Sequence, residues 1–389
     1  MITNKKADGY QLNANGLPTY DAAIIGGGLA GLCVALDLAQ RGHRVAVVER
    51  KQYPFHRVCG EYVSNEVLPY LRRLGADPAA LAPAAISHFL LSAPGGRTLV
   101  APLDLGGFGV SRYALDAFLW QRAVAAGVTF YLPATVAETS FADDMHHLLL
   151  ADGRTLTARV AIAAYGKRAN LDRQLNRPFF AQRSAYLGVK YHLRLPGFRR
   201  DLIALHNFAD GYAGISAIED DKLCCCYLTT RANLKAHGSL PAMEAAVVLK
   251  NPHLKEIFGA AEFLYPQPEV INEISFSPKS PVEQHLLMAG DAAGLITPLC
   301  GNGMAMALHG AALAAAAADD FLAHKTTRPG MENAYATAWQ QHFAARLRVG
   351  RAVQSLFGGP RLTDAVVGIL RHAPAVVRGL MRRTHGPPF

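Results

Sequence analysis

The sequence contains little cysteine, and its arrangement does not suit a structural metal or a disulfide scaffold. The 389-residue chain has six cysteines, at positions 33, 59, 224, 225, 226 and 300, without a Cys-x-x-Cys pair. Cys224 to Cys226 are consecutive, so on a strand their side chains alternate between opposite faces. Cysteine zinc sites and disulfide frameworks are not supported, and we expect no metal.

Long apolar segments are also scarce. Residues 1–20 are polar and lack the apolar core of a secretory signal. The longest run of low charge, from Ala305 to Ala318, is rich in alanine and too short to cross a bilayer. We therefore expect a cytoplasmic protein whose membrane contact, where it has any, is peripheral. With 51% hydrophobic residues the chain can bury two packed domains.

Acidic residues are nearly missing from the C-terminal segment. Residues 346–389 hold eight arginines, no lysine and one acid, Asp364, which gives +7 of the net charge of +9. Apolar residues between Val366 and Met381 recur at helical spacing, although Pro374 should break or kink the helix. Two readings stay open: a basic amphipathic element on an anionic membrane, or a helix packed on the protein with solvated arginines. The arginines are not interleaved with aromatic side chains, so we expect no nucleic acid partner.

A glycine-rich turn near the N-terminus has the surroundings of a dinucleotide site. Residues 22–25 are typical of a buried strand, a G-x-G-x-x-G turn follows, and residues 29–40 show helical apolar spacing. Glycine permits the tight turn and lets the backbone approach a pyrophosphate, while the helix N-terminus supplies N–H donors. The residues expected to bind the nucleotide here are Gly26, Gly28, Leu29, Ala30 and Gly31.

An acidic residue closes the second strand predicted for this unit. Residues 44–48 form that strand and end at Glu49, 18 residues beyond Gly31. A carboxylate at this place accepts hydrogen bonds from an adenosine ribose and repels a 2′-phosphate. The neighbouring Arg50 is expected at the same nucleotide. The nucleotide should therefore be FAD or NAD.

A second glycine-bearing stretch, GDAAGLITPLCGNGM at 290–304, favours FAD. It follows an apolar run at 286–289 and precedes an alanine-rich helix predicted from about 303 to 321. A carboxylate at position 291 can hold a ribityl hydroxyl, and helix N–H groups aimed at the flavin N1/C2 edge would stabilise reduced flavin. Taken alone, the stretch could be a strand, turn and helix with an N-capping aspartate. The residues expected to bind a non-covalent FAD are Gly290, Asp291, Pro298, Gly301, Asn302, Gly303 and Met304.

These stretches resemble the superfamily of flavoprotein monooxygenases and geranylgeranyl reductases, whose fold is similar to that of p-hydroxybenzoate hydroxylase. The resemblance covers most of residues 20–345 and is strongest at GGGLAGL (26–32), RVCGEYVS (57–64) and GDAAGLITPLCGNGMAMAL (290–308). It implies an α/β fold, with a Rossmann-like FAD-binding domain of the glutathione-reductase type and a second, antiparallel β-sheet domain that holds the substrate. We expect a discontinuous FAD domain at 20–75, 100–175 and 278–345, a sheet domain at 76–99 and 176–277, and a basic helical C-terminal segment at 346–389.

The resemblance also assigns roles around residue 59. Cys59 and Gly60 occupy the place of a Cys-Gly pair that lies beside the flavin in reductases of this superfamily. Arg57 or Gly60 would then meet the cofactor, and Cys59 would lie near its reacting edge. The alternative is that Cys59 is a small buried side chain, the commonest fate of a free cysteine.

Two further positions follow from the same resemblance. Arg112 begins an R-x-x-x-D-x-x-L pattern whose arginine tends to reach the cofactor, although it could pair only with Asp116 one helical turn away. Val136 would lie on the strand pair that receives the adenine.

Residues 176–277 change in character and predict the antiparallel sheet of the substrate domain. Strands are expected at 186–195, 202–207, 212–218 and 223–229, separated by turns rich in aspartate and glycine. His206, Asn207 and Tyr212 could face the substrate, although each is more often an ordinary sheet residue. The candidate catalytic residues are Cys59, His206 and Tyr212.

Two departures from the superfamily bear on the reaction. Where its monooxygenases carry Asp-Gly after a strand, at a place that serves the nicotinamide cofactor, this chain has Tyr165-Gly166. NAD(P)H is still the expected reductant, but its mode of binding is open and another donor could replace it. The W-x-W-x-x-P segment of flavin-dependent halogenases is missing, so halogenation is not expected.

The expected function is therefore that of an FAD-dependent oxidoreductase. The first prediction is a monooxygenase that hydroxylates an aromatic or polyketide-like apolar substrate through a flavin hydroperoxide. The alternative, favoured by Cys59 and by the missing aspartate, is an enzyme similar to geranylgeranyl reductase that reduces isolated double bonds of a lipid. A more distant alternative is a non-catalytic FAD-containing protein that binds a membrane surface or a partner.

Overall fold

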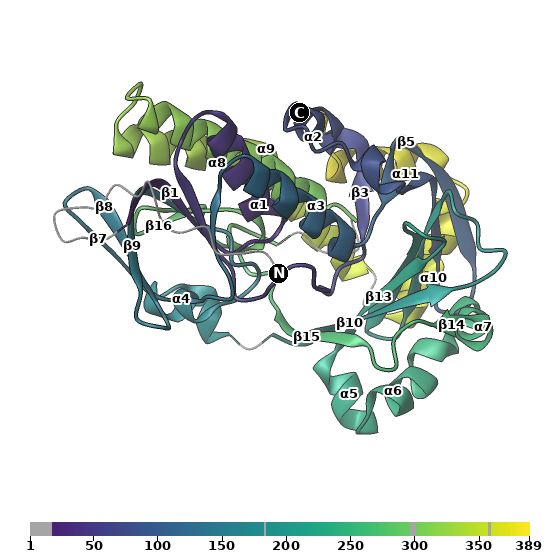
Figure 1. Ribbon diagram of the computed structural model, residues 1–389. Helices are drawn as coiled ribbons and strands as arrows, with labels where there is room; N and C mark the ends of the chain where they lie inside the picture. Colours follow the sequence, from purple (N-terminus) through teal and green to yellow (C-terminus); the bar gives the residue numbers. More distant parts are fainter. Residues whose placement is uncertain (1–17, 183, 296–300, 357–358) are drawn as a thin grey trace.

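Two β-sheets organise the protein in the computed structural model, which describes residues 18–182, 184–295, 301–356 and 359–389 (Figure 1). The first sheet has the strand order β16-β17-β9-β1-β2-β6, with β8 paired to β9 and β7 paired to β8. Its centre is parallel, and its strands are apolar and buried on both faces, as such a sheet requires. The strands are β1 (Thr19–Ile25), β2 (Val45–Val48), β6 (Thr129–Tyr131), β7 (Val136–Ala142), β8 (Met145–Leu150), β9 (Thr155–Ala163), β16 (Val282–Glu283) and β17 (Leu286–Met288).

Long helices cover the first sheet. α1 packs against both α3 and α8, and α8 packs in turn against α9 (Figure 1). The expected helix at 29–40 and the strands at 22–25, 44–48 and 286–289 are confirmed to within a few residues. The helices of this layer and its flanks are α1 (Leu29–Gln40), α2 (Leu68–Arg73), α3 (Arg112–Ala125), α4 (Asn170–Gln174), α8 (Gly303–Leu322) and α9 (Arg328–Leu356).

The helix α8 is longer than the low-charge run at 305–318 suggests. Its 20 residues are, by length and composition, enough to cross a membrane, and 67% of the tested window is buried inside the protein. Alanines on α8 allow close approach to α1 and α9, so its burial is accounted for by protein contacts. We therefore describe α8 as a core helix of the flavin domain.

The second sheet has the order β14-β10-β13-β12-β11-β4-β5-β3, with β15 paired to β10. It is mixed, because β4 runs parallel to β11, whereas a wholly antiparallel sheet was expected. The difference arises because β4 enters from a remote part of the chain and not through a hairpin. The strands are β3 (Tyr62–Ser64), β4 (Ala84–Ser92), β5 (Thr98–Gly109), β10 (Tyr186–Arg194), β11 (Leu202–Phe208), β12 (Gly211–Ala217), β13 (Leu223–Thr230), β14 (Glu262–Phe263) and β15 (Glu269–Ile274).

Each face of the second sheet is covered by a different group of helices. One face packs against α5 (Arg231–His237), α6 (Leu240–Ala246) and α7 (Pro252–Ala260). The other face packs against α10 (Pro360–Leu370) and α11 (Pro374–Thr384). The break between α10 and α11 confirms the effect expected of Pro374, which begins α11. Five short 3-10 turns complete the described elements: Asn65–Val67, Pro78–Leu81, Pro178–Ala181, Val248–Lys250 and Gly290–Ala292.

The domain limits differ from those expected. β3 and all of β5 belong to the second sheet, although residues 62–64 and 100–109 were assigned to the FAD domain. α9 runs through the limit set at 345, and α10 and α11 pack on the second sheet and do not form a separate tail. The composition changes at 346 within a continuous helix, α9, so a change in composition does not mark the limit of a domain here.

Candidate active site

The candidate site begins at one edge of the first sheet. Ile25 at the end of β1 lies in register with Val48 of β2 and Ala163 of β9. The next strand, β17, continues this edge, because Met288 pairs with Ala163. The residues that follow these four strands therefore meet in one crevice at their carboxyl ends, where open α/β sheets bind cofactors.

In the glycine turn after β1, two glycines occupy positions where a side chain would clash with neighbouring backbone. A third glycine occupies a position where a side chain would have room. A Cβ on Gly26, whose φ is +103°, would lie 2.6 Å from the carbonyl oxygen of Ala164, and a Cβ on Gly31 would lie 2.0 Å from that of Gly26. A Cβ on Gly28 would meet only the Arg112 side chain, at 3.7 Å. Gly26 and Gly31 thus allow α1 to approach the sheet, while Gly28 presents bare backbone to the crevice.

Glu49 at the end of β2 is buried and fixed by hydrogen bonds. Its Oε2 accepts from the Gly27 N–H at 2.9 Å and from Arg57 Nη2 at 3.1 Å. Its Oε1 accepts from the Lys51 N–H at 3.1 Å. The carboxylate is therefore presented beside the glycine turn, as ribose recognition requires.

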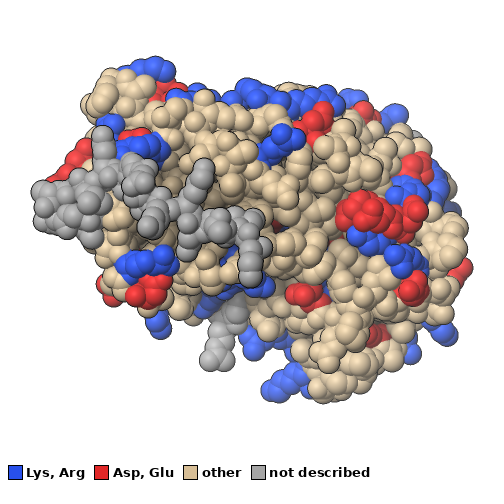
Figure 2. All heavy atoms as spheres, in the orientation of Figure 1, with Lys and Arg blue, Asp and Glu red and all other residues tan. Residues whose placement is uncertain are grey.

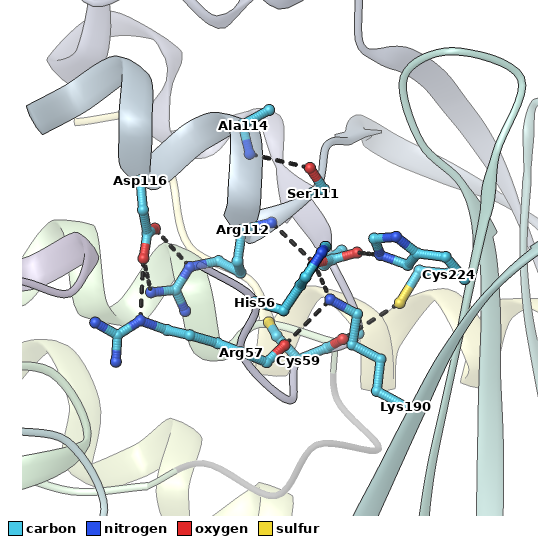
Figure 3. Close-up of polar contacts among 12 residues, drawn as sticks. His56, Arg57, Cys59, Ser111, Arg112, Ala114, Asp116, Lys190 and Cys224 are labelled. Atoms are coloured by element: carbon cyan, nitrogen blue, oxygen red, sulfur yellow. Dashed lines mark hydrogen bonds and ion pairs between the residues drawn. The ribbon is translucent and has the colours of Figure 1, made fainter. Parts of the chain in front are cut away.

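Arg112 and Arg57 converge on Asp116 (Figure 3). Arg112 makes two hydrogen bonds to the carboxylate, at 2.7 and 2.8 Å, and Arg57 Nε makes one at 3.1 Å. The pairing of Arg112 with Asp116 is therefore present, and both arginines also line the cavity described below. Arg112 in addition contacts the Cys59 side chain.

Two cations, the half-buried Lys279 and the buried Arg177, bind the second glycine stretch, and no sequence motif pointed to either. Lys279 donates to the carbonyl oxygens of Asp291 and Lys167, at 2.7 and 2.8 Å. Burial lowers the pKa of Lys279 to about 8, with Asp291 acting in the opposite sense. Arg177 is almost fully buried and donates to the Ala292 carbonyl at 2.9 Å. These contacts tie the turn after β17 to the turn after β9.

One cavity of about 1150 Å³ collects most of the predicted cofactor residues. Ligand cavities commonly measure about 300–1,000 Å³, so this one has room for more than a single small molecule. The residues present fit a dinucleotide that carries a flavin. Gly28 offers bare backbone, Glu49 a fixed carboxylate, and Gly290 a turn with a positive φ. The predicted residues that line the cavity are Gly26, Gly28, Leu29, Ala30, Glu49, Arg50, Arg57, Cys59, Gly60, Arg112, Val136, Gly290, Asp291, Gly301, Gly303 and Met304.

Three predicted cofactor residues are not among those that line the cavity. Gly31 lies beneath the turn, where it allows helix packing. Asn302 is buried and donates its side-chain amide to the carbonyl of Thr384, at 2.9 Å, which ties the start of α8 to the end of α11. Pro298 lies outside the described residues.

The cavity continues into an apolar chamber between the second sheet and the helices α10 and α11. Its walls are aliphatic and come from elements far apart in the sequence. The residues of this chamber are Leu91, Leu99, Leu205, Leu228, Ile271, Ile274, Val366, Leu370, Val377, Leu380 and Met381. One cavity therefore joins the residues expected to hold FAD to a space suited to a hydrocarbon.

Of the three candidate catalytic residues, two line the cavity. Cys59 lies where the flavin-binding residues meet the second sheet, and Tyr212 projects from β12. His206 is on the opposite face of β11, because it pairs with Ala213, which packs towards α5–α7. Its Nδ1 hydrogen-bonds to Ser92 at 2.8 Å, and burial lowers its pKa to about 3. The prediction that His206 faces the substrate is therefore corrected by the alternation of side chains along the strand.

A buried cluster behind Cys59, which we call the Glu61 clamp, joins β10 of the second sheet to the loop of Cys59 and to the start of α3. Glu61 pairs with the fully buried Lys190 of β10, and its other oxygen lies 2.6 Å from His192 Nε2. Lys190 also donates to the Arg57 carbonyl at 3.1 Å (Figure 3). His192 Nδ1 lies 2.5 Å from the hydroxyl of Tyr265. The sequence feature that could have indicated this cluster is a lysine in the middle of a largely apolar strand.

The Glu61 clamp also fixes the loop that carries Cys59. The Cys224 thiol donates to the Cys59 carbonyl at 3.3 Å. Glu61, His192 and Cys224 place potential metal-ligand atoms within 4.8 Å of one another. The ammonium group of Lys190 is paired with the same carboxylate, however, so the cluster is better described as an ion-pair network than as a metal centre.

Comparison with known proteins agrees with this geometry. Residues 21–57, which contain the glycine turn and Glu49, match the family model described as FAD dependent oxidoreductase. The chain carries an FAD-dependent oxidoreductase domain. The remaining site residues lie on elements of a fold that solved structures share. The family match and the curated relatives support an enzyme of the FAD-dependent oxidoreductase class.

Curated relatives match this flavoenzyme over most of its length at low identity. Conditioned medium factor receptor 1 of Dictyostelium discoideum is 23% identical, covering 95% of this chain and 79% of the relative. Menaquinone reductase of Mycolicibacterium smegmatis is 24% identical, covering 88% and 85%. Digeranylgeranylglycerophospholipid reductase 2 of Methanopyrus kandleri is 24% identical, covering 87% and 86%.

Solved structures show the same fold. A geranylgeranyl bacteriochlorophyll reductase-like protein from Thermoplasma acidophilum has a TM-score of 0.76 at 17% identity, covering 92% of each chain. PqsL of Pseudomonas aeruginosa, a probable FAD-dependent monooxygenase, has a TM-score of 0.72 at 17% identity, covering 90% of this chain and 99% of its own. The halogenase PltM has a TM-score of 0.75 at 16% identity, covering 94% and 85%. Reductases, monooxygenases and halogenases thus share this architecture.

Substitution of Gly28 should separate cofactor binding from folding. In Gly28→Ala the added methyl group has room in the protein but projects where a pyrophosphate must approach. We expect a folded protein whose FAD affinity falls by roughly tenfold or more, about 1.4 kcal/mol. The measurement is flavin bound per protein after reconstitution, with far-ultraviolet circular dichroism as the test of folding. Gly31→Ala is the contrast, because its methyl group would overlap the Gly26 carbonyl and should impair folding itself; equal FAD affinity in Gly28→Ala and the wild type would contradict the assignment.

The Glu61 clamp predicts a defined dependence of stability on pH. Lys190 and His192 hold the pKa of Glu61 at about 2, below its usual 4.5, in spite of burial. A lowered carboxyl pKa stabilises the fold above pH 4.5, and this contribution is lost as the pH falls from 4.5 to 2. Glu61→Gln leaves Lys190 buried without its partner and should cost about 3–5 kcal/mol at neutral pH.

Urea unfolding followed by fluorescence at neutral pH and across the acid range measures both effects. In Glu61→Gln, the free energy of unfolding should fall much less than in the wild type as the pH is lowered from 4.5 to 2. Asp152→Asn, at an exposed ion pair with Arg154, is the matched control and should leave stability close to that of the wild type. Equal stability of Glu61→Gln and the wild type would show that the clamp does not stabilise the fold.

Proposed function

We propose that this flavoenzyme reduces isolated carbon–carbon double bonds in a long apolar lipid. The observation that carries the proposal is the continuity of the cavity from Cys59 and the flavin-binding residues to the apolar chamber. Aliphatic walls bind a hydrocarbon chain through burial of apolar surface, at about 25 cal/mol per Å². They offer few hydrogen bonds to orient a phenol for hydroxylation, so the chamber favours the lipid.

Cys59 is the proposed proton donor of this reaction. Reduced FAD, when bound, supplies a hydride to one carbon of the double bond. The thiol gives its proton to the other carbon and is reprotonated from solvent, so the product gains two hydrogen atoms. Arg112 contacts the Cys59 side chain, and the Cys224 thiol holds its carbonyl oxygen, so the protein fixes the position of this group.

The names of the relatives reported above also favour reduction of a lipid over hydroxylation. Two of those that match nearly the whole chain are named as reductases, one of menaquinone and one of digeranylgeranylglycerophospholipid. We infer that the substrate here is likewise a lipid with unsaturated hydrocarbon chains. NAD(P)H is the proposed reductant, and Lys167 and Arg168, which line the cavity, offer charge for its phosphates in the absence of the usual aspartate.

Hydroxylation of an aromatic or polyketide-like apolar substrate is the second candidate. It is favoured by Tyr212, a polar group in the wall of the cavity, and by the fold shared with a probable monooxygenase. The two candidates differ in their need for oxygen. A reductase turns over anaerobically, whereas a hydroxylase consumes one O2 for each product molecule.

The test uses the FAD-loaded enzyme, NADPH or dithionite as the electron source, and two probes: a polyprenyl alcohol and a long-chain alkylphenol. We expect anaerobic reoxidation of the flavin by the polyprenyl alcohol and a product with two additional hydrogen atoms by mass spectrometry. Cys59→Ser should slow this step by about a hundredfold, the usual scale of proton-transfer catalysis. Cys226→Ser, at another cysteine lining the cavity, is the matched control and should retain turnover. Oxygen-dependent addition of one oxygen atom to the alkylphenol, without anaerobic turnover, would overturn the proposal.

A further inference from the structure

The C-terminal hairpin, formed by α10, α11 and the turn at 371–373 between them, has two apolar sides. Its inner side closes the apolar chamber through residues that include Leu370 and Val377, the second of which is 4% exposed. Its outer side carries Ile369, 68% exposed, and Val376, 53% exposed. These two residues flank the turn between the helices, so the tip of the hairpin presents hydrocarbon to solvent.

Exposed arginines lie at the tip and along α11 to its other end. Arg371 lies in the turn, and Arg378 and Arg383 lie on the exposed side of α11. The acids packed near the hairpin are already engaged: Asp104 pairs with Arg382 at 2.7 Å, and Asp364 accepts from the Gly95 N–H at 3.3 Å. Elsewhere, on the face drawn in Figure 2, basic groups are interspersed with acidic ones. The hairpin thus combines a strong positive charge with exposed hydrocarbon, the pattern of an interfacial membrane-binding helix.

The hairpin is anchored at its far end. The Gly386 N–H donates to the side chain of Glu66, and the Phe389 N–H donates to the carbonyl of the same residue at 3.2 Å. The Phe389 ring stacks on His309 at 4.0 Å between centroids. The chain end is therefore fixed to the flavin domain, while the opposite end of α11 carries the exposed tip.

We propose that the C-terminal hairpin docks on an anionic lipid bilayer, with Ile369 and Val376 entering the interface and the arginines binding lipid phosphates. The proposal rests on the proposed function, because it names the source of the lipid substrate. The chamber that would hold a hydrocarbon is lined by the inner side of the same hairpin, so docking would bring the chamber close to the bilayer that contains the lipid. Each arginine near an anionic surface strengthens such binding by about fivefold.

Vesicle flotation of the FAD-loaded enzyme tests the docking. We expect binding to vesicles of phosphatidylcholine mixed with phosphatidylglycerol, weakened by high salt, and little binding to phosphatidylcholine alone. Arg371→Gln/Arg378→Gln/Arg383→Gln should weaken binding by roughly ten- to a hundredfold. Ile369→Ser/Val376→Ser should weaken it at both salt concentrations.

Two matched controls use residues of similar exposure on other elements. Val124→Ser/Leu149→Ser replaces exposed apolar residues of α3 and β8, and Arg122→Gln/Arg194→Gln/Arg199→Gln removes three exposed charges elsewhere; both should bind like the wild type. Equal binding to neutral vesicles, no binding to anionic vesicles, or unchanged binding in the hairpin variants would overturn the docking.

Turnover separates this inference from the proposed function. With a detergent-solubilised polyprenyl alcohol the hairpin variants should match the wild type, because the substituted residues do not line the cavity. With the same alcohol embedded in anionic vesicles they should be slower in proportion to their lost binding. Absence of turnover in detergent for every form would reject the reductase function, while vesicle flotation would still decide the docking.

Discussion

The arrangement of the site depends on the carboxylate of Glu61. This residue has a φ of +56°, a left-handed conformation that costs a non-glycine residue about 1–3 kcal/mol. The conformation persists because the side chain has several fixed partners at once: Lys190 and His192 of β10, and the backbone N–H of Arg112 at the start of α3, at 2.8 Å. One buried anion therefore holds together a strand of the second sheet, a helix of the first layer and the loop that carries Cys59. It acts together with other contacts between the two parts of the cavity, such as the hydrogen bond from Asn302 at the start of α8 to Thr384 at the end of α11.

The two halves of the cavity impose opposite chemical requirements, and the fold meets them with different kinds of structure. A dinucleotide needs backbone donors and a few fixed charges, which the parallel strands supply at their carboxyl ends through Gly28 and Glu49. A hydrocarbon needs surface that water does not wet, which the broad second sheet and the C-terminal hairpin supply. The cations Lys279 and Arg177 bind backbone carbonyl groups, so they shape the turns without placing a free charge in the apolar part.

The sequence predicted the flavin half of the site better than the substrate half, for physical reasons. Gly26, Gly28 and Glu49 act through local backbone geometry, so their spacing is visible in a short stretch of chain. Lys190 and Glu61 meet across 129 positions, and a pattern read along the chain carries no information on such a pairing. His206 shows a smaller error of the same kind, because its strand was predicted correctly but the face it occupies depends on which neighbour the strand packs against. Gly31 and Asn302 were found by motif, and their contacts are with the protein in the described structure.

The basic C-terminal segment shows why two readings of a sequence can both describe the same element. A helix packed on the protein and a helix lying on a membrane both require an apolar stripe beside a charged one, so composition alone cannot separate them. In the structure the apolar stripe of α11 that includes Val377 and Met381 lines the chamber. This agrees with the interpretation of the segment as a helix packed on the protein. Ile369 and Val376 lie outside that stripe and remain exposed, although a solvated helix gains nothing from hydrocarbon at those positions. A second, smaller apolar surface next to arginines is instead what a protein requires when the same hairpin must close a lipid cavity on one side and meet a lipid surface on the other.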